Sequence, residues 1–393
     1  MKILVLPSWY PNNTSNLGSF FIEQARFLNA NGFDVKILMV EGLHTKNYYF
    51  QRIKRLIKGQ SGELTTTFLE QDPDAFSFPV IIQKNWSDDR KLKQLDRAYL
   101  KAFKKLNWFP DIMHLQGMYK YGLSSYLISE VHKIPMVVVE HSPFRMENYS
   151  GCQQERIKHI FQSAKKIAGV SYFHKACLSV VDTERTVEVV WNFMDEEMFK
   201  FENLSKPDDV FIITTILRAS YVKDPITFFE SILRFVELYS CNRPIEVHVV
   251  GVSSIQELLT MKGVDIDVIS KYEVLDGILK FHAWLDRDAV KALHKKSSVF
   301  VSTSIDEPYG VALREAMLCG VPVISTRSGG PEDTLAHGLG VLVDIGDEAG
   351  IALNLKGLYD GTLNFDANKL RQHVIVQSGR QAFLKRMKMF YDV

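Results

Sequence analysis

Cysteine is scarce in this chain of 393 residues. The four cysteines, Cys152, Cys177, Cys241 and Cys319, include no C-x-x-C pair. This argues against a structural zinc site or a disulfide framework and suits a reducing cytoplasm. No apolar run is long enough to span a membrane. The N-terminal MKILVLPSW has one lysine and a short apolar run, so we expect a first strand there rather than a signal peptide.

The chain also lacks an excess of either charge. Its formal net charge is +1, which gives no reason to expect a nucleic-acid partner. The charges are nevertheless unevenly spread, because residues 1–190 hold 25 Lys and Arg against 18 Asp and Glu, and the remainder holds 22 against 28. Such an asymmetry suggests two halves that meet different partners.

Several motifs are missing as well. There is no G-x-x-x-x-G-K, which argues against an NTPase, and Gly338–Gly340 lacks the third glycine of a dinucleotide fingerprint. No D-x-D pair ends a predicted strand, and we expect the DPD at Asp72–Asp74 to be a solvated loop. We therefore expect neither a metal ion nor a cofactor.

Apolar runs typical of strands alternate with helical patterns along the whole chain. KILVL is followed by a predicted helix over Gly18–Gly32, in which Phe21, Ala25 and Leu28 share one face, and then by FDVKILMV. This βαβ order predicts a parallel sheet. The pattern restarts at VFIITTIL, after the polar segment Trp191–Asp209.

The predicted fold class is therefore α/β, with two doubly wound Rossmann-like domains facing a central cleft. A chain of this length is too long for one ordinary core. We place the N-terminal domain at residues 1–205 and the C-terminal domain at residues 206–377. We expect the last helix, residues 378–393, to pack back on the N-terminal domain.

The stretch EPYGVALREAMLCGVPVISTRSGGPED, which begins at Glu307, is the most informative. Glu307 follows the predicted strand SSVFVSTS, and ligands of open α/β sheets bind beyond the carboxyl ends of the strands. A helix that starts here would direct the N–H groups of Tyr309, Gly310 and Val311 toward that place, which suits a diphosphate. Glu315 lies eight residues further on, a rise of at most about 12 Å.

Carboxylates suit sugar recognition, because ionised oxygens only accept hydrogen bonds and sugars present many O–H donors. We predict that Glu307 binds hydroxyls of a transferred sugar and that Glu315 binds ribose hydroxyls of the donor. The alternative is that Glu307 caps the helix and Glu315 is solvated. The nearby Gly310, Gly320-x-Pro322 and Gly329–Gly330 favour the functional interpretation.

An E-x7-E motif followed by G-x-P and G-G-x-x-E resembles the donor domain of retaining glycosyltransferases of family 4, which have the GT-B fold. The resemblance covers nearly the whole chain and is strongest in the C-terminal half. Other segments follow the family's order: DIMHLQG, PMVVVEHS, VVWNFMDEEMF, LRASYVKD and FHAWLDRDAVKALHKKSSVFVSTS. The sequence departs from the pattern at four family glycines, which are replaced by Phe193, Leu217, Asp224 and Ala283.

The resemblance implies roles for two cations and for three residues of the N-terminal half. Arg218 and Lys223 would neutralise the leaving diphosphate in place of a metal ion, because fixed cations stabilise charge that builds at bond cleavage. The alternative is two ordinary surface cations. Gly18 and Ser19, at a helix start, would lend N–H groups to the same diphosphate, and His141 would lie near the donor sugar and acceptor. Each of these three has a structural alternative, a plain helix start or a strand-end histidine.

Two basic segments carry interleaved apolar residues. The first, Lys46–Lys58, has five basic residues and could contact an anionic membrane or a lipid-linked acceptor, or could be an ordinary basic loop. The second, Arg90–Trp108, has apolar residues at helical spacing and favours an amphipathic helix packed on its sheet, with a solvated basic face.

The function expected from the resemblance is transfer of a sugar, with retention, from a nucleoside-diphosphate sugar to a glycan or lipid-linked saccharide. This would serve cell-surface polysaccharide or glycolipid synthesis in the cytoplasm, with possible peripheral contact at an anionic membrane. The alternatives are a nucleotide-sugar epimerase or phosphorylase on the same architecture, and a non-catalytic sugar-nucleotide-binding protein.

Overall fold

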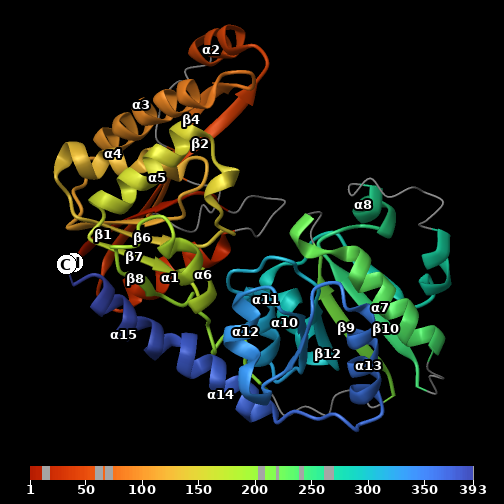
Figure 1. The fold of residues 1–393 in the computed structure, drawn as a ribbon. Helices are drawn as coiled ribbons and strands as arrows, with labels where there is room; N and C mark the ends of the chain where they lie inside the picture. Colours follow the sequence, from red (N-terminus) through yellow and green to blue (C-terminus); the bar gives the residue numbers. More distant parts are fainter. Residues whose placement is uncertain are drawn as a thin grey trace. The chain divides into compact units, whose positions relative to one another are not determined.

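The computed structural model describes residues 1–10, 18–57, 65–66, 74–201, 209–217, 221–238, 243–260 and 270–392. Within them the chain forms two compact units. Unit 1 comprises Met1–Val190 and Leu384–Val393, and unit 2 comprises Trp191–Phe383. Each unit is built on one β-sheet covered by helices (Figure 1).

Unit 1 has an eight-stranded sheet in the order β3-β4-β2-β1-β5-β6-β7-β8. Neighbouring strands are parallel, except that β3 is antiparallel to β4. The strands are β1 (Lys2–Pro7), β2 (Asp34–Thr45), β3 (Thr65–Thr66), β4 (Ala75–Gln83), β5 (Ile112–Gln116), β6 (Met136–Glu140), β7 (Lys166–Gly169) and β8 (Val187–Val189). The helices are α1 (Ser19–Ala30), α2 (Tyr48–Ile57), α3 (Asp88–Leu106), α4 (Gly122–His132), η1 (Met146–Asn148), α5 (Gly151–Ser163) and α6 (Tyr172–Ser179).

Unit 2 has a six-stranded sheet in the order β11-β10-β9-β12-β13-β14, with every neighbouring pair parallel. Its strands are β9 (Phe211–Ile216), β10 (Ile245–Val250), β11 (Leu279–His282), β12 (Val299–Ser302), β13 (Val323–Thr326) and β14 (Val341–Val343). Its helices are η2 (Tyr221–Lys223), α7 (Pro225–Leu238), α8 (Ile255–Thr260), η3 (Ser270–Leu275), α10 (Arg287–Lys296), α11 (Val311–Leu318), α12 (Gly330–Leu335), η4 (Ala336–Gly338), α13 (Glu348–Tyr359), α14 (Ala367–Ser378) and the start of α15 (Arg380–Phe390).

The strand order of both sheets reverses beside the first strand of each unit, as in doubly wound folds. In unit 2 the reversal lies between β9 and β12, and in unit 1 it lies between β1 and β5. The predicted fold class, two doubly wound α/β parts, is confirmed. The predicted face of α1 is confirmed too, since Phe21, Ala25 and Leu28 are all buried.

The boundary between the units falls after Val190, earlier than the predicted boundary after residue 205. The expectation that the polar segment after Val190 belongs to the N-terminal part is therefore wrong. Two arginines near the end of the chain explain the difference. Arg380 forms a two-pronged ion pair with Asp195, with N–O distances of 2.8 and 2.9 Å. Arg371 donates to the carbonyl oxygens of Glu196 and Phe199.

The chain end, Leu384–Val393, belongs to unit 1, whereas residues 378–383 of the predicted last helix belong to unit 2. The hydroxyl of Tyr391 is 2.7 Å from Nδ1 of the buried His114 on β5, and Lys166 on β7 donates to the carbonyl oxygens of Met389 and Asp392. α15 starts in unit 2 and ends in unit 1. In the described part of the chain, no helix is both long and apolar enough to cross a membrane.

Candidate functional site

The loops that follow β9 and β12 meet at the strand-order reversal of unit 2. β9 leads toward η2, and β12 leads into residues 303–310, which we call the Glu307 loop. The hydroxyl of Thr303 donates to the carbonyl oxygens of Lys223 and Asp224, at 3.0 and 2.9 Å. The two loops are therefore tied together at the place where open α/β sheets bind their ligands.

Lys223 and Glu307 form an ion pair across these two loops. The Nζ atom of Lys223 lies 2.5 Å from Oε2 of Glu307 and 3.3 Å from the hydroxyl of Ser304. Both charged side chains are largely buried, with 19% and 18% of their surface exposed. The geometry thus places one fixed cation and one carboxylate side by side, both still reachable from solvent.

Glu307 is held in its ionised form. Burial by itself raises the pKa of this carboxyl group, but the Lys223 ammonium and the backbone N–H groups of Gly310 and Tyr309 outweigh that effect and bring the pKa below its ordinary value. The N–H of Gly310 lies 3.0 Å from Oε1. Glu307 is therefore a hydrogen-bond acceptor at neutral pH.

Two of the three predicted phosphate-facing N–H groups have a partner within the loop itself. Those of Gly310 and Tyr309 are directed at Glu307, so this glutamate also caps α11, whose first residue is Val311. The ring of Tyr309 is buried, and its hydroxyl lies 2.9 Å from the carbonyl oxygen of Asn192. Tyr309 thus anchors the Glu307 loop to the segment that follows Val190.

Glu315 is not solvated, so that part of the alternative interpretation is wrong. Its side chain, on α11, is only 3% exposed and forms an ion pair with Arg287 at the start of α10. The guanidinium of Arg287 also lies 5.0 Å from the ring centre of Phe199. Sequence reasoning missed Arg287, because the packing of α10 beside α11 brings together residues 28 positions apart.

A second missed residue is Arg314, which directly precedes Glu315 on α11 and is completely buried. Its guanidinium lies 3.7 Å from the ring centre of Tyr309 and 5.5 Å from that of Trp191. Burial lowers its pKa, and among the described residues no hydrogen-bond partner reaches its Nε or Nη1. Arg314 therefore stacks against the Glu307 loop as a cation with unused donors.

The Gly329–Gly330 turn closes the other side of the Glu307 loop. The N–H of Gly330 donates to the carbonyl oxygen of Glu307 at 2.7 Å. The N–H of Glu307 in turn donates to the carbonyl oxygen of Ser328 at 2.9 Å. A Cβ atom on Gly330 would lie 2.4 Å from the carbonyl oxygen of Pro308. This close approach of the Pro308 backbone explains why position 330 needs a glycine.

Asp224 shows how the chain accommodates one replaced family glycine. Its φ angle is 38°, in the left-handed region that glycine favours and that Asp and Asn tolerate better than most residues. Its carboxylate accepts a 2.6 Å hydrogen bond from the hydroxyl of Thr227, at the start of α7. The aspartate therefore keeps the turn after Lys223 and adds a helix cap.

Three predicted residues of unit 1 lie close to one another. Gly18, with φ of 90°, precedes Ser19, the first residue of α1. The rings of Phe20 and Phe21, next on the helix, lie 5.1 and 5.2 Å from the ring of His141. The start of α1 and His141 therefore form one cluster within unit 1. The roles that the resemblance implies for Gly18, Ser19 and His141 stay predictions.

The buried Glu140 fixes the backbone around His141. Its carboxylate accepts hydrogen bonds from the N–H groups of His141 and Ser142, both at 2.9 Å, and from that of Met118. Burial raises the pKa of Glu140, although these hydrogen bonds oppose the shift. The strand-end histidine is thus held by a neighbour to which the sequence assigned no role.

Residues 196–376 match the family model described as Glycosyl transferases group 1. All of the matched residues lie in unit 2. N-acetyl-alpha-D-glucosaminyl L-malate synthase of Bacillus anthracis is 23% identical over 257 residues, which are 62% of this chain and 63% of that enzyme. Sucrose-phosphate synthase of Zea mays is 30% identical over 153 residues, 38% of this chain and only 14% of that enzyme.

Solved structures of GT-B glycosyltransferases have the same fold over the full length of the chain. Sucrose-phosphate synthase from Thermosynechococcus elongatus has a TM-score of 0.75 at 16% identity and covers 100% of this chain and 98% of its own. Anabaena HepE in complex with UDP-glucose has a TM-score of 0.69 at 16% identity, covering 100% of both chains. The predicted GT-B fold is confirmed by these matches.

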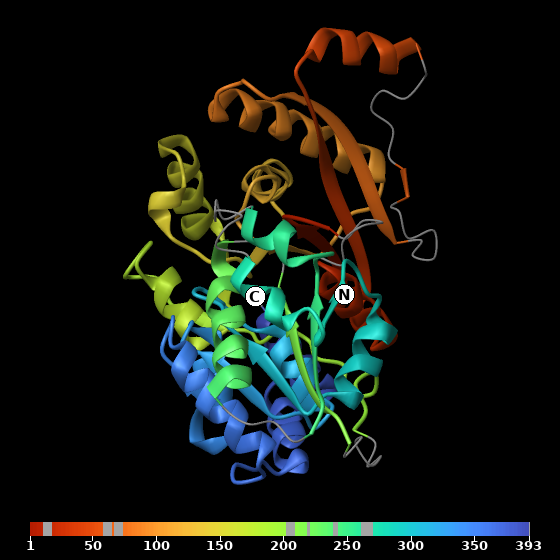
Figure 2. The ribbon, with the colours of Figure 1, turned by 90° about the vertical axis from the view of Figure 1, so that its right-hand side faces the viewer.

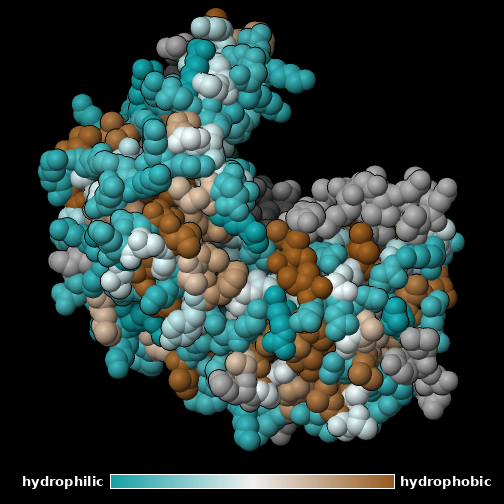
Figure 3. Space-filling view, viewed as in Figure 1, coloured by the Kyte–Doolittle hydropathy of each residue, from teal (hydrophilic) through white to brown (hydrophobic). Residues whose placement is uncertain are grey.

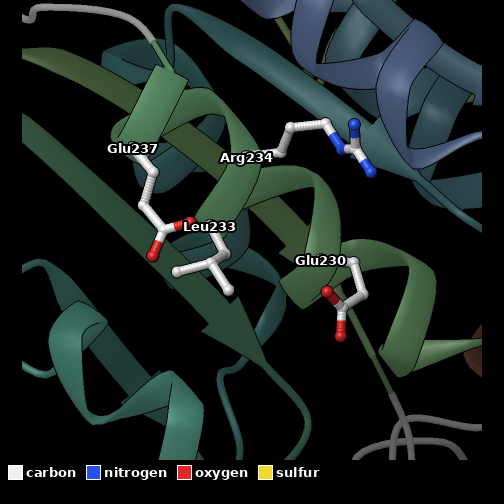
Figure 4. A pocket seen from close by; sticks show the side chains of 4 residues that line it. All are labelled: Glu230, Leu233, Arg234 and Glu237. Carbon is white, nitrogen blue, oxygen red and sulfur yellow. The ribbon is translucent and has the colours of Figure 1, made fainter.

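The region that matches this family model, residues 196–376, contains the Lys223–Glu307 pair, Glu315 and Arg314. Arg218 lies outside the described residues, so its role stays a prediction. A separate shallow hollow is lined by Glu230, Leu233, Arg234 and Glu237, all on α7 (Figure 4). None of the predicted site residues lines that hollow. Within the described ranges, no group of three or more His, Cys, Asp or Glu side chains could hold a metal ion.

Proposed function

We propose that the protein is a retaining glycosyltransferase that moves a sugar from a nucleoside-diphosphate sugar to an acceptor hydroxyl. The observation that carries this proposal is the Lys223–Glu307 ion pair at the strand-order reversal of a glycosyl transferases group 1 domain. The HepE structures, which contain UDP, UDP with glucose, or UDP-glucose, support a nucleotide-sugar donor.

In the proposed reaction the acceptor oxygen attacks the anomeric carbon from the face that the diphosphate leaves. The bond between that carbon and the diphosphate oxygen breaks, the new glycosidic bond forms, and the acceptor proton passes to a phosphate oxygen. Lys223, together with Arg218, stabilises the growing charge on the diphosphate, and Glu307 binds hydroxyls of the transferred sugar. The reaction needs no metal ion or cofactor.

Glu315 would bind the ribose of the donor, and Tyr309, Gly310 and Val311 would form the wall beside the diphosphate. Gly18 and Ser19 would donate backbone N–H groups to the diphosphate, and His141 would lie near the donor sugar and the acceptor. The proposed acceptor is a glycan or a lipid-linked saccharide, used in the cytoplasm to build a cell-surface polysaccharide or glycolipid.

A thermal-shift screen of UDP-, GDP- and ADP-sugars tests the donor class, because a ligand that binds only the native state raises the melting temperature. We expect one nucleotide series to raise it. Product NMR with that donor and simple sugar acceptors should then show the same anomeric configuration in donor and product. Conversion of the donor without an acceptor would indicate an epimerase, and a melting shift without turnover would indicate a non-catalytic binder.

A further inference from the structure

The second helix of unit 1 stands at the end of a projecting ribbon. β2 pairs with β1 over Asp34–Ile37 and then continues to Thr45 paired with β4, which adds about 25 Å of two-stranded ribbon. Figures 1 and 2 both show α2 at the far end of this ribbon. The neighbouring helix α3 packs along β4 and β2 and supports the ribbon.

The base of α2 is fixed rather than loosely attached. The ring of Tyr48, its first residue, lies 4.7 Å from the ring of Trp86, which follows β4. The guanidinium of Arg90 lies 4.3 Å from the centre of the same indole. The N–H of Lys84 donates to the carbonyl oxygen of Thr45 at 2.9 Å and closes the ribbon. The helix is therefore displayed in a defined orientation on unit 1.

One side of α2 exposes large apolar side chains to solvent. Tyr49, Phe50 and Ile53 are 68%, 60% and 57% exposed. Their spacing of i, i+1 and i+4 places them on one side of the helix. On the face drawn in Figure 3, the tip of the ribbon is mostly hydrophilic, with a few hydrophobic atoms at its outer end. We call these three residues the α2 apolar strip.

Basic residues accompany the α2 apolar strip in the sequence. The sequence from Lys46 to Lys58 contains five Lys and Arg and no Asp or Glu. Lys46 and Lys54 are both exposed, and Lys54 follows Ile53 directly in the helix. An aromatic and aliphatic strip with cations beside it has the chemistry of helices that lie in the interface of an anionic bilayer.

We infer that α2 docks unit 1 on an anionic lipid surface, with the α2 apolar strip inserted at the depth of the headgroups. A strip of three side chains suits shallow insertion, and the flanking cations supply attraction to anionic lipid. A second copy of this chain is a poorer partner, because pairing two such segments would bring like charges together. The inference does not depend on sugar transfer, since it concerns a surface built by α2 and the β2–β4 ribbon.

Co-sedimentation of the full chain with vesicles tests the inference. Vesicles contain either phosphatidylcholine alone or phosphatidylcholine with phosphatidylglycerol at about 7:3, at low salt and at about 0.5 M NaCl. We expect binding to the anionic vesicles at low salt and release at high salt. Phe50→Ser with Ile53→Ser should lower the partition coefficient about tenfold, and Lys54→Glu should lower it by about the same factor or more.

Two control variants match these changes elsewhere on the surface. Leu353→Ser removes an apolar side chain that is 62% exposed on α13, and Lys104→Glu reverses an exposed charge on α3. Both should bind vesicles within about twofold of the wild type. Because all substituted side chains are exposed, we expect unchanged melting temperatures.

Three results would overturn the inference. The first is no binding, or equal binding to neutral and anionic vesicles. The second is an equal loss of binding in Lys104→Glu, which would assign the attraction to α3 or to overall charge. The third is a wild-type dimer in sedimentation velocity that Phe50→Ser with Ile53→Ser converts to monomer, which would make the strip a self-association surface.

Discussion

Glu315 has a buried cationic partner, and this changes what a conservative substitution should do. The sequence predicts only a ribose-binding role for Glu315, but the structure also pairs this carboxylate with Arg287. The neutral amide would leave a largely buried guanidinium without its counter-charge. We expect the free energy of unfolding in urea to fall by about 2–3 kcal/mol.

The control for this change is Glu246→Gln. Glu246 pairs with Lys280 at the surface, with its side chain 32% exposed, so its loss should cost less than about 1 kcal/mol. Equal effects from the two variants would show that the Glu315–Arg287 pair has no special structural role. If the ribose assignment is right, Glu315→Gln should also raise the donor KM more than it lowers kcat.

Glu307 should give the protein a measurable pH dependence at acid pH. Its folded-state pKa lies below the ordinary value of 4.5, so its stabilising contribution is fully present above pH 4.5 and is lost as the pH falls through the folded-state value. We expect the stability difference between wild type and Glu307→Gln to be constant near neutral pH and to shrink below pH 4.5. Urea unfolding of both proteins at a series of pH values measures this difference in unfolding free energy. A difference that grew on acidification would contradict the assigned pKa direction.

At the scale of secondary-structure elements, the Gly329–Gly330 turn holds the Glu307 loop in place. Gly330→Ala would place a methyl group 2.4 Å from the carbonyl oxygen of Pro308, so the loop must move. We expect a loss of about 1–3 kcal/mol in unfolding free energy, as for other overpacked sites, and lower turnover because Glu307 shifts. The control is Gly277→Ala, where a Cβ meets nothing within 4 Å. Equal stability and activity in both variants would show that this turn does not position the Glu307 loop.

Local sequence patterns predicted the elements well, because periodicity reports which side of a strand or helix is buried. The helix after Gly18 and the placement of Glu307 after β12 both followed from such patterns. The partners of the glutamates did not follow, since Arg287 reaches Glu315 only through the packing of α10 on α11. The boundary was misplaced for the same reason, because Asp195 pairs with an arginine 185 positions away.

At the scale of the whole molecule, we predict sugar transfer without a metal ion. The cations Lys223 and Arg218 are assigned to the diphosphate charge that a divalent ion would otherwise neutralise. We therefore expect turnover with the donor found by thermal shift to be largely unaffected by EDTA. Complete loss of turnover that added Mn²⁺ restores would contradict this assignment.

The most direct test of the central claim combines diphosphate affinity and turnover in Glu307→Gln. In the free protein the Lys223 ammonium lies 2.5 Å from the Glu307 carboxylate, so a diphosphate must compete with that carboxylate for the same cation. Dissociation constants for the nucleoside diphosphate identified by thermal shift, measured by calorimetry, and kcat at saturating donor are compared with wild type and with Glu246→Gln. We predict that Glu307→Gln binds the diphosphate more tightly, by about threefold to tenfold, because a competing negative charge is gone. We predict that its kcat falls by at least about 100-fold, because the carboxylate that orients the sugar is lost. An unchanged or weaker affinity together with a kcat within about twofold of wild type would contradict the claim that the Lys223–Glu307 pair is the donor site.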